Sequence, residues 1–327
     1  MVACLPCVKT AANKSIVIGV FLLTVGLAIF LLAFSLAGYQ KDTWRSATIL
    51  CLLIFGLVGI ALFVIWEKWF CKKSFIPWEL MADKTVIGAC ILYAVLFVSF
   101  YLWDGYFYSY LQVVHGINIT NTGYIYNIYS IGSCFWGIVV AIGIKYSGRF
   151  KWLALYFGMP IITLGCGLMI LFRQPNVNIG YVIMSQIFIA FGGGTLVICG
   201  EIAAMAVSQH TEMAQILAVL GLSSSVGGAI GGAMSGAIWW NTLPSALAKA
   251  LPEESKDLLN DIYGSIVVQM SYPFGTPIRD AVLVGYGEAQ KRMCIAATCV
   301  LVLGWLGVLM FRDVRLADVR NVKGRVL

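Results

Sequence analysis

The sequence predicts an all-α membrane protein with eight membrane-spanning helices, and three observations support that prediction. Of its 327 residues, 60% are hydrophobic and 11% are charged, whereas soluble domains carry roughly a quarter charged residues. The mean hydropathy is +0.88. Long stretches with few or no charges follow one another along the chain, and each is long enough to cross a hydrocarbon core, which takes about 20 residues of helix.

The apolar stretches are continuous and rich in Leu, Ile, Gly and Ala, whereas a transmembrane barrel would show alternating segments of about 10 residues. Residues 1–15 precede the first stretch and do not form a secretory signal, because the apolar run of about 22 residues that follows is longer than the apolar core of a signal peptide, which has roughly 7 to 15 residues. The predicted helices span 16–37, 46–66, 85–106, 122–144, 152–172, 179–200, 214–238 and 293–311.

The distribution of Lys and Arg predicts the orientation, because cytosolic connections carry the excess of positive charge. With the N-terminus in the cytosol, the inner segments hold 14 cations and the outer connections hold 8. Both termini are therefore expected in the cytosol, with a cytosolic loop at 67–84, a long extracellular loop at 239–292 and a cytosolic tail at 312–327. The outer cations are Lys41, Arg45, Arg173, Lys249, Lys256, Arg279, Lys291 and Arg292.

The net charge of +7 is interpreted as the excess of Lys and Arg on the cytosolic side, where these residues interact with anionic membrane lipids. A nucleic-acid partner is not expected, because the chain has no soluble domain to present such a surface.

Asp104 is the first candidate functional residue, because acids within membrane spans are costly and commonly functional. It lies in a stretch dense in aromatic residues near the expected outer boundary of the third span. Two interpretations stay open: an interfacial aromatic belt with a solvated acid, or a proton or substrate site at a cavity mouth. The aromatic candidates for such a site are Tyr101, Trp103, Tyr106 and Tyr108.

Glu201 closes the predicted sixth span near the cytosolic boundary. It is either an ordinary charge at a helix end or part of a proton path or inner gate.

Small residues form a stripe on the predicted seventh span, where Gly228, Gly232 and Gly236 recur every four residues, with Gly227, Gly231 and Ser235 beside them. Such spacing lets two helix backbones approach closely. The stripe is either a permanently packed contact or a sliding surface of a gate.

Two other glycine sites carry a packing or gating prediction. The first is the run of three glycines Gly192, Gly193 and Gly194, which is either a permanently packed contact or a sliding surface of a gate. Glycine also adds local flexibility there. Gly148 and Arg149 lie in the short inner connection KYSGRFK, which is expected to anchor two helix ends.

Several classes of function lack the residues that they need. The chain has two histidines, too few for an iron or copper site of clustered imidazoles, so we expect no protein-bound metal or other cofactor. Neither a G-x-x-x-x-G-K-[ST] phosphate loop nor a G-x-S-x-G motif occurs, so ATP-driven pumping and serine hydrolysis lack support. The chain is therefore predicted to be no enzyme, and transport driven by a gradient remains.

A dense set of segments resembles the fungal siderophore iron transporters of the major facilitator superfamily, over roughly residues 16–327. These segments are YQKDTWRS, FVSFYLWDGYFYSYLQVV, YSIGSCFWGIVV, YSGRFKWLALYFG, FRQPNVNIGYVIM, QIFIAFGGGTLVI, SSVGGAIGG, SYPFGTPIRDA, YGEAQKRM and VKGRV. The resemblance implies a proton-coupled importer of ferric siderophore chelates, with 14 spans in two six-helix bundles joined by an extra pair of helices.

By that resemblance, residues 16–66 match the extra pair and residues 85–311 match the C-terminal six-helix transport bundle. The N-terminal bundle is then missing, and this chain alone is not expected to complete a transport cycle. The resemblance also implies that Tyr263, Tyr272 and Arg279 lie in the last extracellular loop, near the substrate entrance. The expected location is the plasma membrane or an endosomal vesicle membrane.

Three hypotheses of function follow. The first is an importer of ferric siderophores, or part of one, that uses alternating access and protons. The second is a proton antiporter that exports drugs or thiol peptides. The third is a non-transporting membrane remnant that associates with a full-length relative.

Overall fold

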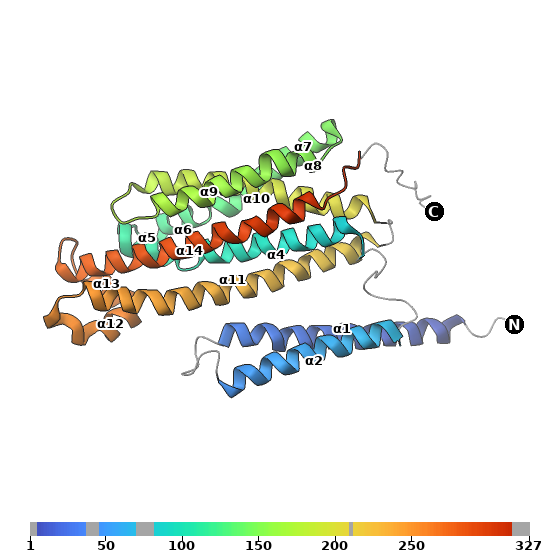
Figure 1. Cartoon of the computed structure of the whole chain (residues 1–327), viewed down its shortest axis with the longest axis horizontal. Helices are drawn as coiled ribbons and strands as arrows, with labels where there is room; N and C mark the ends of the chain where they lie inside the picture. Colours follow the sequence, from blue (N-terminus) through green and yellow to red (C-terminus); the bar gives the residue numbers. More distant parts are fainter. Residues whose placement is uncertain (1–4, 37–45, 70–81, 209–211, 316–327) are drawn as a thin grey trace.

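The computed structural model describes residues 5–36, 46–69, 82–208 and 212–315, and every regular element in them is a helix (Figure 1). Seven helical segments in this part of the chain are long and apolar enough to cross a membrane. A shorter apolar stretch, Ile18–Phe34, lies within the first helix. The predicted all-α class is therefore confirmed.

Six long helices form the main bundle (Figure 1). Their bounds are α4 (Lys84–Asp104), α7 (Ile128–Ser147), α9 (Met159–Phe172), α10 (Ile179–Ala206), α11 (Met213–Ala250) and α14 (Pro277–Leu309). The two most buried are α4 and α10. Helix α4 packs against α10, α11 and α14, while α10 packs against α7 and α9. The bundle is thus built around α4 and α10.

The first two helices, α1 (Leu5–Leu36) and α2 (Ala47–Trp69), form a hairpin beside the bundle (Figure 1). Their backbones approach closely, since a Cβ added to Gly56 would lie 2.6 Å from the Cα of Phe30. Helix α1 also packs against α11 of the bundle. Phe63 of α2 lies in one buried cluster with Val219 of α11, so both helices of the hairpin contact the bundle.

The connection between the last two long helices is shorter than the predicted 239–292. Helix α11 continues to Ala250, and α14 begins at Pro277, where Thr276 caps its first turn. Charged residues such as Glu288 interrupt the apolar pattern of α14 without ending the helix. The remaining connection carries three short helices: η3 (Glu253–Leu258), α12 (Leu259–Gly264) and α13 (Ile266–Ser271).

The third predicted span, 85–106, is not one continuous helix. Helix α4 ends at Asp104, and α5 (Phe107–His115) begins after two intervening residues. We call Gly105 and Tyr106 the break. Helix α6 (Ile119–Tyr126) then leads into α7, and α8 (Lys151–Leu153) joins α9 through one π-helical turn, η2 (Ala154–Gly158).

Candidate functional site

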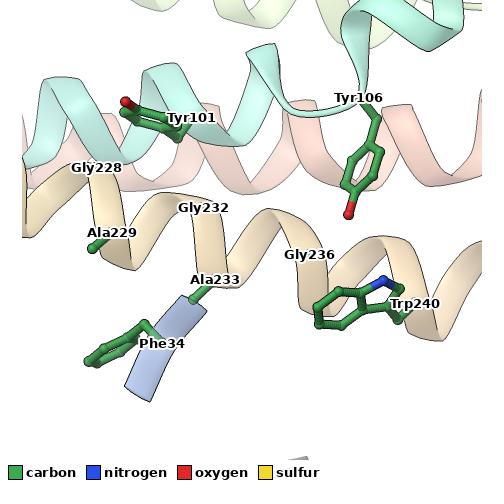
Figure 2. Close-up of a pocket in the computed structure, with 9 residues that line it drawn as sticks. All are labelled: Phe34, Tyr101, Tyr106, Gly228, Ala229, Gly232, Ala233, Gly236 and Trp240. Atoms are coloured by element: carbon green, nitrogen blue, oxygen red, sulfur yellow. The ribbon is translucent and has the colours of Figure 1, made fainter. Parts of the chain in front are cut away.

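A cavity of about 360 Å³ lies between α4, α11 and α1 (Figure 2). Among the residues that the structure describes, those that line it are aromatic or small, and none is charged. The lining residues are Phe34, Tyr101, Tyr106, Gly228, Ala229, Gly232, Ala233, Gly236 and Trp240. A volume of this size lies within the range of small-molecule sites, roughly 300 to 1,000 Å³.

Two adjacent faces of α11 have different surroundings. We call Gly227, Gly231 and Ser235 the packed face, because a Cβ on Gly231 would lie 2.7 Å from the carbonyl oxygen of Val98 in α4. A Cβ on Gly227 would likewise overlap the carbonyl oxygen of Ala94. The backbones of α4 and α11 are therefore in contact along this face.

The predicted stripe forms the other face, the open face of Gly228, Gly232 and Gly236, which lines the cavity. A Cβ on Gly232 would meet no atom within 4 Å, whereas one on Gly228 would lie 2.8 Å from the ring of Tyr101. The predicted close helix contact at Gly232 is thus wrong. The contact lies one residue earlier, on the packed face.

The break places Tyr106 at the cavity. Figure 2 shows its ring projecting from the break toward α11. Tyr106 has a left-handed backbone with φ of 58°, the one positive φ outside glycine among the described residues. Its ring stacks on Trp239 at a centroid distance of 4.1 Å. Left-handed backbone at a residue other than glycine costs on the order of 1 kcal/mol or more and clusters at functional sites.

Asp104, the last residue of α4, is hydrogen-bonded to a residue of the neighbouring helix α6. Its carboxylate accepts a 2.6 Å hydrogen bond from the hydroxyl of Tyr126, at the end of α6. The side chain is partly buried and does not line the cavity. Its position therefore couples the break to α6.

The other aromatic candidates lie in different environments. Tyr101 is 43% exposed and lines the cavity, whereas Trp103 is 1% exposed. The ring of Trp103 packs on Tyr129, with centroids 5.3 Å apart. The hydroxyl of Tyr108 donates to the carbonyl oxygen of Ile119. Tyr101 and Tyr106 are thus the two predicted aromatic residues that the structure brings together at the cavity.

The three consecutive glycines of α10 contact two neighbouring helices. A Cβ on Gly192 would lie 2.5 Å from the backbone nitrogen of Ile162 in α9, and one on Gly194 would lie 2.7 Å from the carbonyl oxygen of Ser133 in α7. Gly193 faces the ring of Tyr129. These glycines allow α10 to pack closely on both sides.

Glu201 lies inside α10, which continues to Ala206. The residue is partly buried beside Tyr93. The hydroxyl of Tyr93 donates to the carbonyl oxygen of Val197. The structure therefore places Glu201 within the bundle, away from the residues that line the cavity.

The candidates near α12 and α13 form a separate group. Arg279 is 2% exposed and donates to the carbonyl oxygens of Val113, at 2.6 Å, and of Gln269. It ties α13 to the end of α5. Tyr272 lines a groove with residues of α12, and partial burial raises the pKa of Tyr263. None of the three lines the cavity.

Gly148 caps the C-terminus of α7 with φ of 66°, a conformation that favours glycine. The exposed Arg149 lines a hollow of about 320 Å³ beside Trp152. This pair lies apart from the cavity.

Arg173 is buried, whereas the sequence predicts it only as a cation of an outer loop. It follows α9, is 0% exposed, and donates to the carbonyl oxygen of Trp103 and to Oε1 of Gln290. A lone Arg at the end of an apolar run was the available sequence signal.

Comparison with solved structures indicates the class of protein to which the chain belongs. No protein-family model matches the chain. The fold resembles the crystal structure of a bacterial homologue of the human lysosomal transporter Spinster, in an inward-facing and occupied conformation, with a TM-score of 0.56 and 13% identity. The match covers 88% of this chain and 66% of that chain. At this identity the likeness shows the fold alone. With seven helical segments long and apolar enough to cross a membrane among the described residues, the class is that of an integral membrane protein.

Sequence relatives define the family more narrowly. The chain is 52% identical over 311 residues to the MFS siderochrome iron transporter 1 of Ajellomyces capsulatus, with 95% of this chain and 53% of that protein covered. It is 39% identical to the siderophore iron transporter mirB of Emericella nidulans and 38% identical to the siderophore iron transporter 1 of Schizosaccharomyces pombe. Those matches cover 94% and 91% of this chain, and 51% and 48% of the relatives.

The chain belongs to the fungal siderochrome iron transporters of the major facilitator superfamily. It spans about half the length of the curated relatives that it matches.

Proposed function

We propose that this chain provides one bundle of a proton-coupled transporter that imports ferric siderophore chelates by alternating access. The cavity between α4 and α11 carries the proposal. Among the described residues, those that line it are aromatic or small and none is charged, and the relatives of the chain are siderochrome and siderophore iron transporters.

The lining of the cavity suits a chelate better than a free ion. A chelate encloses its iron and presents a large polar and apolar surface, which tyrosine and tryptophan recognise by stacking and hydrogen bonding. Free ferric iron would instead need several oxygen ligands of negative charge. Iron is therefore cargo inside its chelate, and no resident metal is invoked.

A second bundle completes the proposed site. Facilitators hold substrate between two pseudo-symmetric bundles and rock one against the other. The six long helices described here make one bundle, so the proposed transporter closes its site with a second one. The proposal includes both termini of the chain in the cytosol, as the distribution of Lys and Arg predicts, and a membrane that is the cell surface or that of an endosomal vesicle.

Chelate binding to the complete transporter, this chain together with its second bundle, in lipid nanodiscs tests the cargo site. Saturable binding of a radiolabelled ferric siderophore is expected for the wild type, with competition by the unlabelled chelate. Gly232→Leu should weaken chelate binding, because a leucine side chain would occupy the cavity. Gly232→Ala is its matched control and should keep binding, because a methyl group leaves room in the cavity. Absence of saturable binding, or tight binding of an exported drug or thiol peptide instead, would refute the proposal.

Asp104 is the proposed coupling residue, since it is the acid at the break and is held by Tyr126. In iron-starved cells that lack other siderophore transporters and contain the complete transporter, Asp104→Asn is expected to abolish chelate accumulation. Tyr126→Phe keeps the acid and should retain uptake with an altered pH profile. Wild-type uptake and pH dependence in Asp104→Asn would contradict the coupling role.

A further inference from the structure

The break interrupts the hydrogen bonding of a membrane helix. Backbone groups in a membrane must be paired within the protein, because no water satisfies them there. The carbonyl oxygen of Gly105 accepts a 3.3 Å hydrogen bond from Nε2 of Gln290, and that of Trp103 accepts one from Nη1 of Arg173. Two polar side chains outside α4 and α5 therefore bind the carbonyl groups at the break.

Arg173 binds the break at an energetic cost. Its side chain is fully buried, and it forms no ion pair with any residue that the structure describes. Its guanidinium carbon lies 4.0 Å from the centroid of the Phe107 ring, and Nε and Nη2 have no hydrogen-bond partner among the described residues. Burying a charge in this way is unfavourable, and an apolar residue of similar volume is often as stable or more stable.

The contacts of Arg173 converge on both sides of the break. Nη1 bonds Trp103, one residue before Asp104, while the guanidinium lies over the ring of Phe107, the first residue of α5. The same Nη1 bonds Oε1 of Gln290 at 3.0 Å, and Gln290 in turn bonds Gly105. Arg173 and Gln290 thus hold the last turn of α4, the break and the first turn of α5 together.

We infer that Arg173 is a positioning residue that, with Gln290, fixes the break so that Tyr106 is held at the cavity. The left-handed backbone of Tyr106 and its stacking on Trp239 depend on the break keeping this geometry. Arg173 itself does not line the cavity and acts through the break. The inference uses the proposed function only to call the cavity a cargo site.

Hydrogen–deuterium exchange of the purified chain in nanodiscs tests the inference without any cargo. The reporter is the peptide containing the Gly105 amide, which donates to the carbonyl oxygen of Tyr101 at 3.1 Å. In Arg173→Met, which keeps volume and removes charge and donors, exchange of this peptide is expected to rise about tenfold or more, with α2 and the middle of α10 unchanged.

Arg279→Met is the matched control, since Arg279 is a second buried arginine that bonds carbonyl oxygens outside the break. It is expected to raise exchange around Val113 and Gln269 and to leave the Gly105 peptide unchanged. Arg173→Lys is expected to restore part of the protection, because an ammonium group can still donate to Trp103.

Three outcomes would overturn the inference: unchanged exchange of the Gly105 peptide in Arg173→Met, an equal rise over the whole bundle, or no protection in Arg173→Lys. Chelate binding, measured separately, reports on the cargo site. A failure of cargo binding is therefore distinguishable from a failure of the positioning role.

Discussion

The packed face and the open face of α11 are offset by one residue in the sequence, but their surroundings differ. The packed face contacts the backbone of α4, and the open face lines the cavity. Both repeat small residues every four positions. Gly227 and Gly231 meet the backbone of α4, whereas Gly232 meets open space. Successive residues of a helix point about 100° apart, so adjacent stripes can serve helix packing and a cavity at once. Close contact and cargo access are thus separable by mutation.

The largest effect is expected from Gly227→Leu on the packed face. A side chain here would collide with the carbonyl oxygen of Ala94, and backbone cannot move aside as a flexible side chain can. The cost should exceed the roughly 1–3 kcal/mol of ordinary overpacking. We expect loss of the monodisperse peak in fluorescence-detected size exclusion. A folded variant with wild-type thermal stability would contradict the packed contact.

Gly232→Leu on the open face should separate folding from binding. The new side chain enters the cavity, so thermal stability should change by less than about 1 kcal/mol. Chelate binding in nanodiscs should weaken at least about tenfold, equivalent to roughly 1.4 kcal/mol. A destabilised protein would mean that this face is packed after all.

Gly105→Ala extends the comparison to the break. An added Cβ would overlap Oγ of Ser235 on the packed face. Overpacking should cost about 1–3 kcal/mol in thermal stability. The double variant Gly105→Ala with Ser235→Gly should recover most of that loss, and the absence of recovery would show that the two positions do not share a contact.

The smallest effect is expected from Gly236→Ala, at the far end of the open face. A Cβ there would lie 3.4 Å from the ring of Trp240, an ordinary contact. Replacing glycine by alanine in a helix also gains up to about 1 kcal/mol. Melting temperature should stay equal or rise slightly. A marked fall would indicate that the open face closes against another helix.

The sequence predicted the fold class well, because hydrophobicity over about 20 residues is the dominant signal of a membrane helix. The start of α14 was missed, since charges such as Glu288 and Arg292 end an apolar window but not a helix. Those two residues form an i,i+4 ion pair on the surface of α14. Helix continuation there depends on local hydrogen bonding, which hydropathy does not measure. The end of α11 was missed because Pro244, which usually marks a helix boundary, lies inside this helix.

The candidate site was predicted only in part. Tyr101, Tyr106 and the open-face glycines were named from the sequence and lie together at the cavity. The break was missed, although Asp104 followed by Gly105 is a turn signal, because the apolar run continues across it. Arg173 was missed because its burial depends on α4, α5 and α14, which meet it only in the folded bundle.

The different roles of the packed face and the open face are tested by comparing Gly231→Leu with Gly232→Leu. Thermal stability and ferric-chelate binding are measured for both variants in the same nanodisc preparation. Gly231→Leu is expected to lose the folded bundle, whereas Gly232→Leu should melt like the wild type and lose chelate binding. Equal destabilisation of both variants, or full chelate binding by Gly232→Leu, would contradict these roles.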